Sequence, residues 1–426
     1  MTVELTLRYI NAQLFKVFLI SVFFLYYETR FIPGAIHSWI VVLGLLVLMP
    51  IACSSLLKKT ARVSYDYLFI GAILLIIFLG FLINFSTATW INTQAYILML
   101  LTYIYVKEST TESTLDFILK ILRTFLVING ILVIAQLVTG EFFPARYIAT
   151  GNPPLIIPSG VSDGPTKNGF LVVFGVSALI ANFFFKRLTY SHSDALIILL
   201  GAISLFASGS RAAIVSAIGV FMFGILFALV QSIKDKRFTL SSRVLIMFPA
   251  LLGGIIYFNV KFGWELSYVL GDFSSSTSGM DLIKFKIQNF IDDSALERLK
   301  GYDFLTVLMQ NMPFQFFTLG IGAGSFETLY GSNIHNSWME LFIVSGLIGF
   351  VIFLSLNIYV IVQALKSNVA LYVTPLMFSL LSIMIFMMAH DILRGRIYWV
   401  ALGIIAGYTH LSKKRRSIDS DRCNFP

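Results

Sequence analysis

Twelve apolar stretches divide this 426-residue chain, and they constrain its fold more than any other feature. Each is close to the ~20 residues that a helix needs to cross the hydrocarbon core of a bilayer. Only 12% of the residues are charged, whereas soluble domains carry about 25%. The sequence therefore predicts an all-α polytopic membrane protein with about 12 transmembrane helices. The stretches lie at roughly 10–27, 34–56, 67–84, 90–106, 116–139, 168–185, 194–209, 211–233, 243–260, 337–365, 370–389 and 396–411.

Two of these stretches are weaker candidates for spans. The stretch 90–106 contains Asn92, Thr93 and Gln94, and 396–411 is short. The first stretch is long enough to span and lacks the small-residue pattern that follows a cleaved signal peptide. Cys53 and Cys423 suggest neither a disulfide framework nor a zinc site.

Lysine and arginine predict the orientation, because they are enriched in cytoplasmic loops. With a cytoplasmic N-terminus, 17 basic residues fall on the cytoplasmic side and 6 in the shorter outer loops. The cytoplasmic set is Arg8, Lys58, Lys59, Arg62, Lys107, Lys186, Arg187, Lys234, Lys236, Arg237, Arg243, Lys366, Lys413, Lys414, Arg415, Arg416 and Arg422. The outer set is Arg30, Arg146, Lys167, Arg211, Arg394 and Arg396. Both termini are therefore expected in the cytoplasm, with 412–426 as a basic tail, and the net charge of +9 reflects topology, not nucleic-acid binding.

Two long segments fall on the outer side of this single membrane domain, residues 1–426. In 140–167, the density of proline and glycine predicts turns, with little room for helix or strand. The second segment, 261–336, precedes the tenth span. Its part from Asp281 to Gln310 looks helical, with a capping box at Ser294 and Glu297 and a stop at Pro313. Three glycines then follow, and their pattern fits a tight turn: Gly320, Gly322 and Gly324.

The candidate site residues lie on the outer side. Arg211 begins the eighth stretch, where the helix macrodipole disfavours a cation unless an anion binds nearby. The alternative is an arginine whose charge extends to the interface. Arg298 follows the loop capping box and, taken alone, fits a solvated helix surface. His335 lies just before Ser337 and Glu340, which form a second S-x-x-E pattern that predicts a capping box.

These residues suggest chemistry on an anionic substrate. A helix N-terminus offers free N–H groups for phosphate, and two arginines add bidentate donors. A histidine kept neutral by nearby positive charge can accept a proton. The alternative for His335 is an interfacial histidine that packs against Trp338. His390, Arg394 and Arg396, on the same predicted face, are additional candidates.

The motifs of residues 200–360 resemble those of the O-antigen ligase and polymerase family (WaaL-like and Wzy-like membrane glycosyltransferases). His335 and Asn336, nine residues, and then Gly346-x-x-Gly349 match its signature. S-G-S-R-A-A at 208–213, E-R-L at 297–299 and L-G-I-G-A-G-S-F at 319–326 are similar to its other motifs.

The resemblance implies a GT-C-like glycosyltransferase in the bacterial inner membrane. Such enzymes transfer a glycan from undecaprenyl diphosphate to an acceptor hydroxyl on the periplasmic face, without cofactor or metal. On matching positions, Arg211 and Arg298 would bind the diphosphate and His335 would activate the acceptor.

Three functions stay open at this point. We favour an O-antigen, exopolysaccharide or capsule polymerase, whose acceptor is another glycan. The first alternative is an O-antigen ligase, whose acceptor is lipid A core. The second is a polysaccharide or lipid flippase, or another transporter, which predicts polar groups deep in several spans.

Overall fold

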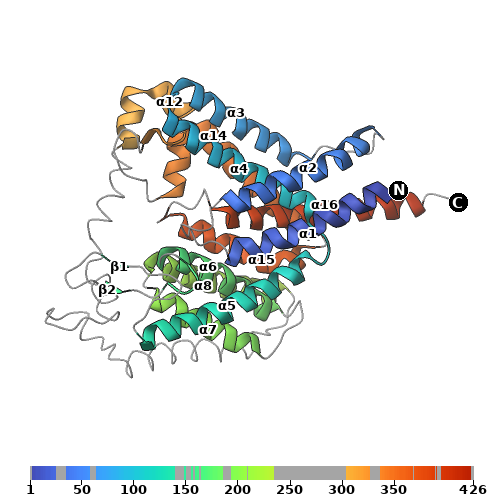
Figure 1. The fold of residues 1–426 in the computed structure, drawn as a ribbon, viewed down its shortest axis with the longest axis vertical. Coiled ribbons are helices and arrows are strands. Elements are labelled where there is room, and N and C mark those ends of the chain that lie inside the picture. Colours follow the sequence, from blue (N-terminus) through green and yellow to red (C-terminus); the bar gives the residue numbers. More distant parts are fainter. Residues whose placement is uncertain are drawn as a thin grey trace.

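The structure of the protein is a computed structural model, and Figure 1 shows its helices. It describes residues 2–24, 35–57, 64–139, 148–149, 155–156, 159–162, 165–185, 193–208, 210–234, 304–326, 336–367, 369–388, 390 and 395–423. The elements, in chain order, are α1 (Thr2–Phe24), α2 (Ala35–Leu57), α3 (Asp66–Ile83), α4 (Thr87–Ser109), α5 (Thr114–Thr139), β1 (Ile148–Ala149), β2 (Leu155–Ile156), α6 (Pro165–Phe185), α7 (Ser193–Ala207), α8 (Arg211–Lys234), α12 (Pro313–Phe317), α14 (Ser337–Lys366), α15 (Ala370–Phe386) and α16 (Arg396–Cys423).

The predicted apolar stretches coincide with helices wherever the structure describes them. The exception, 243–260, lies outside the described residues. Four helical segments are long and apolar enough to cross a membrane: Glu4–Phe24, Asp66–Ile83, Thr114–Gln136 and Ser337–Lys366. Shorter apolar helices accompany them. The prediction of a helical membrane protein is thus confirmed at this level.

Helix α3 shows why the bundle suits a lipid environment. Leu68, Leu75 and Leu82 lie seven residues apart, and they are 62%, 59% and 54% exposed. The opposite face, with Ile70 and Ile77, is buried in the core. In water such a leucine stripe would be an unusual exposed apolar patch, whereas lipid tails cover it at no cost.

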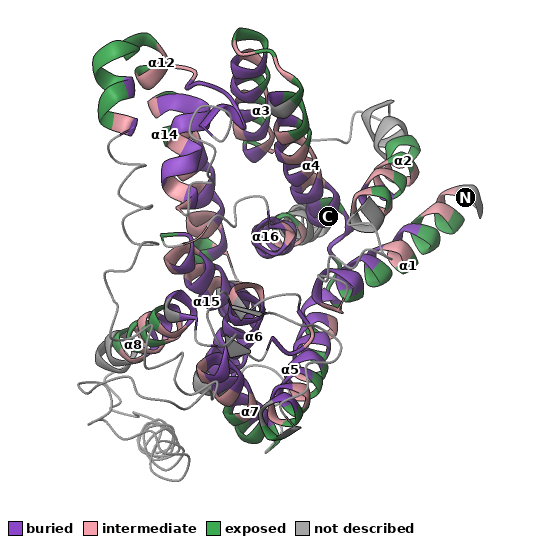
Figure 2. Cartoon of the chain, turned by 60° about the vertical axis from the view of Figure 1, so that its left-hand side comes forward, coloured by how far each residue is buried: buried purple, intermediate pink, exposed green. Residues whose placement is uncertain are grey.

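The two weaker stretches form helices that pack along each other. Helix α4 begins with a capping box between Ser86 and Thr89, and it packs along α16. Residues 397–405 of α16 are almost completely buried (Figure 2). A helix that contacts protein on most sides need not be as apolar as one that contacts lipid, and this explains the weaker signal of 396–411. It does not explain 90–106, because Gln94 is exposed there.

The helix ends gather into two groups. We call the first group the basic end: the residues near 64–67, 107–115, 359–372 and 406–413. There the Leu115 amide donates to the Tyr408 hydroxyl at 2.8 Å, and both chain termini lie on that side of Figure 1. We call the second group the glycine end: the residues near 80–87, 318–324, 336–346 and 386–396. Helices α3, α4, α14, α15 and α16 run alternately between these two ends.

Two local expectations about the segment 140–167 need correction. The segment 140–167 contains β1 and β2, which pair antiparallel with Ile148 opposite Ile156, because its few apolar residues suffice for a two-residue ladder. Helix α6 already starts at Pro165, a residue suited to the first helical turn.

The basic tail continues α16 as a helix to Cys423, because nothing in its sequence terminates that helix. Pro313 does end the helical residues 304–311, as predicted, but it also starts α12.

The two groups of helix ends give a direct test of orientation. In a variant without Cys53 and Cys423, a cysteine at Thr87 should react with a membrane-impermeant thiol reagent in spheroplasts. A cysteine at Ser113 should react only after lysis, because the charge asymmetry predicts that the basic end faces the cytoplasm. Both positions are exposed in the protein. The reverse labelling pattern would contradict the orientation.

Candidate functional site

Some of the candidate site residues lie within the described part of the chain, and others lie outside it. His335, Arg298 and Arg394 lie outside the described residues. Arg211 is the first residue of α8, and its side chain also lies outside them. His390 and Arg396 are described and lie at the glycine end.

The start of α14 follows His335 directly in the sequence. Asn336 is its N-cap residue, with extended backbone, and its side-chain oxygen accepts the N–H groups of Trp338 and Met339 at 3.0 and 3.1 Å. An asparagine in this position satisfies two of the N–H groups that a helix leaves unpaired at its start. The cap fixes the backbone at the residue that follows His335.

The predicted capping box at Ser337 and Glu340 is wrong. Because Asn336 takes the cap position, Ser337 becomes the first helical residue. Its hydroxyl donates to the His390 carbonyl at 2.8 Å, and its N–H donates to the Met387 carbonyl at 2.9 Å. The first turn of α14 is therefore tied to the end of α15.

These bonds change the expected mechanism of anion binding. The N–H groups of Ser337, Trp338, Met339 and Glu340 all donate to protein oxygens. They are not open to a phosphate, contrary to the expectation from the sequence. What remains for an anion is the positive end of the helix macrodipole and the neighbouring side chains.

Glu340 instead accepts a hydrogen bond across the bundle. The hydroxyl of Tyr96 in α4 donates to its carboxylate at 2.7 Å, and Glu340 is only 3% exposed. A buried carboxylate is costly unless it is hydrogen-bonded. This bond joins α4 to the first turn of α14.

A continuous set of contacts links the start of α14 with the start of α8. His390 packs its ring 4.9 Å from Phe386 at the end of α15. Phe386 packs 5.5 Å from Phe170 of α6. Gly169, which precedes Phe170 in α6, approaches Ser210 so closely that a Cβ added to the glycine would lie 2.8 Å from the serine Cβ. The starts of α8 and α14 are thus parts of one packed end of the bundle.

Ser210 holds the cap position of α8. Its carbonyl accepts the Ile214 N–H at 3.1 Å, but its buried hydroxyl has no hydrogen-bond partner within the described part of the chain. Ser208 does not cap the helix, since its hydroxyl donates to the Leu205 carbonyl at 2.7 Å. Among the described residues, the Ser210 hydroxyl therefore contributes no hydrogen bond to the start of α8.

The other described candidate, Arg396, begins α16. Its guanidinium donates to the Ser38 hydroxyl of α2 at 2.8 Å. Arg396 and His390 both have structural contacts, so each has a packing role that needs no substrate.

The glycines of the two motifs contact each other. Gly346 interrupts the helical backbone of α14 with φ 65°, and Gly320 and Gly322 have φ values of 67° and 80°. The interruption frees two carbonyls of α14, which accept N–H groups from the glycine segment: Ile321 N to Ile343 O at 2.8 Å and Gly322 N to Val344 O at 3.2 Å. The predicted tight turn at Gly320 to Gly324 is confirmed, and it packs against the kink of α14.

These backbones approach too closely for side chains. A Cβ on Gly346 would lie 2.5 Å from the Thr318 carbonyl oxygen, and one on Gly320 would lie 2.4 Å from the Ile343 oxygen. Gly322 meets α3 in the same way, with an added Cβ 2.7 Å from the Gly80 oxygen. We call these four residues the glycine junction. It connects α3, α14 and the segment 318–324.

Two buried ion pairs escaped the sequence analysis. Asp66 pairs with Lys107 at 2.8 Å, and Asp194 holds Arg123 through two bonds of 2.7 and 2.8 Å. Both lie at the basic end. The signal in the sequence was weak, because each pair joins residues that are 41 or 71 positions apart.

The glycine junction predicts an asymmetry between two glycine substitutions. Gly346→Ala should lower the free energy of unfolding by about 2–6 kcal/mol, since a backbone conformation that is open essentially only to glycine (φ 65°, ψ −177°) and overpacking each cost ~1–3 kcal/mol. Gly71→Ala, in α3, is the control: nothing lies within 4 Å of its added Cβ, and helix propensity alone should stabilise by up to ~1 kcal/mol. Thermal unfolding of the purified variants measures both. Equal midpoints would show that the junction does not constrain the fold.

Comparison of the sequence with protein-family models gives no match, and comparison with curated proteins gives none either.

Proposed function

We propose that the protein is a membrane glycosyltransferase that transfers a glycan from a polyprenyl diphosphate, undecaprenyl diphosphate, to an acceptor hydroxyl. The observation that supports it most is the structure around the H-N-x₉-G-x-x-G motif. Asn336 caps α14 and Gly346 kinks it against the glycine segment, so each described residue has a structural reason for its spacing from His335. Twelve spans in a GT-C-like arrangement, in the bacterial inner membrane with the site facing the periplasm, belong to the same proposal.

His335 is the proposed general base. A sugar hydroxyl is a poor nucleophile at neutral pH, and removal of its proton during attack contributes typically ~10²–10⁴-fold to the rate. His335 precedes the N-cap of a helix whose first turn is tied to two other helices, through Ser337 and Glu340. Such support restricts the movement of the backbone beside the base.

Arg211 and Arg298 are the proposed ligands of the diphosphate. Because the first N–H groups of α14 already donate to protein oxygens, the charge of the leaving diphosphate must be met mainly by side chains. One guanidinium group can donate two parallel hydrogen bonds to phosphate oxygens, and a lysine ammonium cannot reproduce this geometry. Arg211 begins the helix that packs at the same end of the bundle as the start of α14. No metal or cofactor takes part in the proposed reaction.

The preferred acceptor is a second lipid-linked glycan, which makes the protein an O-antigen, exopolysaccharide or capsule polymerase. Lipid A core is the alternative acceptor, for a ligase.

The transporter alternative retains one structural observation. Asn168 and Asn182 of α6 are buried, and their amide groups have no hydrogen-bond partner among the described residues. They are uncharged, so they do not supply the ionisable midplane groups that a proton-coupled transporter uses. We therefore place this function second.

The first experiment separates the base from the diphosphate ligands in purified enzyme with lipid-linked donor and acceptor. His335→Ala should reduce transfer ~10²–10⁴-fold while donor binding stays near wild type. Arg211→Lys and Arg298→Lys should instead weaken donor binding, by roughly tenfold or more, because two charge-assisted hydrogen bonds are lost.

Two outcomes would contradict these assignments of the base and of the diphosphate ligands. Transfer near the wild-type rate in His335→Ala would remove the base assignment and make His390 the next candidate. Unchanged donor binding in both lysine variants would show that the arginines are structural.

The second experiment identifies the acceptor from the glycans left on the carrier lipid. In cells that lack the protein, single repeat units should accumulate on undecaprenyl diphosphate, because a polymerase consumes them. Accumulation of full-length chains there would instead indicate a ligase. No change in either pool, with the lipid intermediates normally exposed outside, would contradict glycan transfer.

A further inference from the structure

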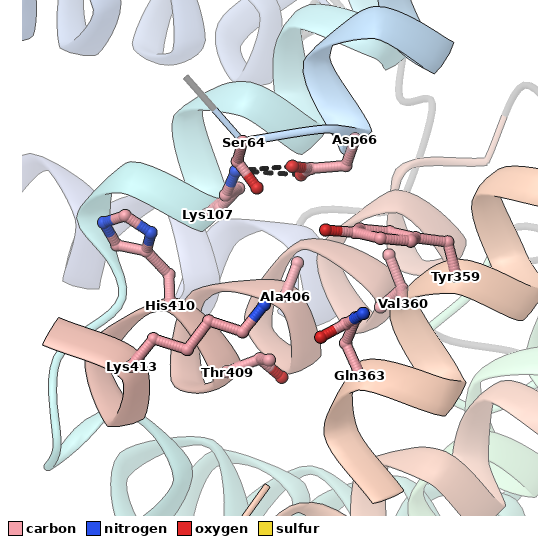
Figure 3. Close-up of a pocket in the computed structure, with 10 residues that line it drawn as sticks. All are labelled: Ser64, Asp66, Lys107, Tyr359, Val360, Gln363, Ala406, Thr409, His410 and Lys413. Atoms are coloured by element: carbon pink, nitrogen blue, oxygen red, sulfur yellow. Dashed lines mark hydrogen bonds and ion pairs between the residues drawn. The ribbon is translucent and has the colours of Figure 1, made fainter. Parts of the chain in front are cut away.

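A polar pocket lies at the basic end, at the opposite end of α14 from its Asn336 cap. It is formed where the start of α3, the end of α4, the end of α14 and the last part of α16 meet (Figure 3). The residues that line it are Ser64, Asp66, Lys107, Tyr359, Val360, Gln363, Ala406, Thr409, His410 and Lys413.

The inner wall of the pocket is rigid and charged. Asp66 and Lys107 form an ion pair at 2.8 Å, and both side chains are 2% exposed. The Tyr103 hydroxyl donates to Asp66 at 2.5 Å, and the Lys107 ammonium lies 3.8 Å from the centre of the Tyr67 ring. Because these contacts hold both members of the pair, the wall keeps its shape and presents a balanced charge.

The rim adds positive charge to this balanced wall. His410 and Lys413 are three residues apart on α16, which places them on the same face of the helix. Figure 3 shows the Lys413 side chain extending across the pocket towards Gln363. Together the lining residues include two lysines and a histidine but a single carboxylate. The pocket therefore has a net positive charge and several hydrogen-bond donors.

The depth of the pocket matches the headgroup layer of a membrane. Asp66 is the first residue of one candidate span, Asp66–Ile83. Gln363 lies three residues before the end of another, Ser337–Lys366. A pocket bounded by the ends of two spans lies where the hydrocarbon core gives way to polar headgroups. Basic pockets between helices on the cytoplasmic side are suited to phosphate headgroups.

We propose that this pocket binds a phosphate-bearing anion: the phosphodiester of an acidic phospholipid, or a soluble phosphate compound. Lys413 and His410 donate to the phosphate oxygens, and the amide of Gln363 and the hydroxyl of Ser64 contact the rest of the headgroup. The Asp66–Lys107 pair limits how deeply the anion enters. This site is independent of the proposed glycosyl transfer, since it lies at the other end of the bundle.

The test uses the purified full-length protein in an uncharged detergent. Thermal unfolding is followed while phosphatidylglycerol, phosphatidylcholine with the same acyl chains, or glycerol phosphate is titrated. The variants are Lys413→Ala and the double variant Lys413→Ala/His410→Ala, whose altered side chains are exposed and not part of the core. Lys366→Ala is the matched control, because Lys366 is an exposed lysine at the same end of the bundle and does not line the pocket.

Phosphatidylglycerol should raise the unfolding temperature of the wild type and of Lys366→Ala at equal concentrations, while phosphatidylcholine should not. The concentration for half of the shift should rise about fivefold in Lys413→Ala, as expected for one lysine near an anionic headgroup, and further in the double variant. A response to glycerol phosphate as well would assign the anion to a soluble source, and a response to the lipid alone would assign it to the bilayer.

Three outcomes would overturn the proposal. These are the absence of any shift in the wild type, an equal shift with phosphatidylcholine, or an unchanged half-maximal concentration in the double variant. In the last case Lys413 is an interfacial lysine whose charge simply extends to water.

Discussion

Hydrogen bonds between the kinked part of α14 and the glycine segment hold together the end of the bundle on which the proposed chemistry depends. A break in a helix leaves carbonyl groups without their usual N–H partners, and this is costly away from water. Here the carbonyls of Ile343 and Val344 receive the N–H groups of Ile321 and Gly322. These hydrogen bonds form only if the two backbones are in direct contact, and glycine in both α14 and the segment 318–324 allows this close approach. The kink, the turn and the approach to α3 are therefore one feature of the fold.

The start of α14 depends on this arrangement. Its first turn is fixed by the Asn336 cap, by the end of α15 and by Tyr96 of α4. Nine residues separate Asn336 from Gly346, so the cap and the kink delimit a short rigid piece of helix. The spacing of the motif thus has a physical reason, which is independent of any resemblance to a family.

The helices could be predicted from hydropathy because a lipid-facing helix needs an apolar surface along its whole length, as the leucine stripe of α3 shows. The same rule explains the weaker signal of α16, since other helices surround its residues 397–405. The turn at Gly320 was predictable because closely spaced glycines are typical of turns and loops.

The sequence could not predict which side chains on different helices form hydrogen bonds or ion pairs with each other. The pattern S-x-x-E at Ser337 fits a capping box, yet Asn336 competes for the same position and Glu340 finds Tyr96 244 residues away. The ion pair of Asp66 with Lys107, 41 positions apart, was not predictable either, because it depends on how α3 and α4 pack. Local rules rank such alternatives poorly when a tertiary contact decides between them.

The saturated first turn of α14 has a consequence for turnover. An enzyme that held a diphosphate with helix N–H groups would hold the released carrier as tightly as the loaded one, since those groups contact the part common to both. Uniform binding of this kind lowers the Michaelis constant without raising the rate of chemistry. With those N–H groups occupied by Asn336 and Met387, affinity for the spent carrier would depend on side chains instead. For the reaction proposed above, the first turn of α14 would then add nothing to the retention of the carrier lipid between cycles of chain growth.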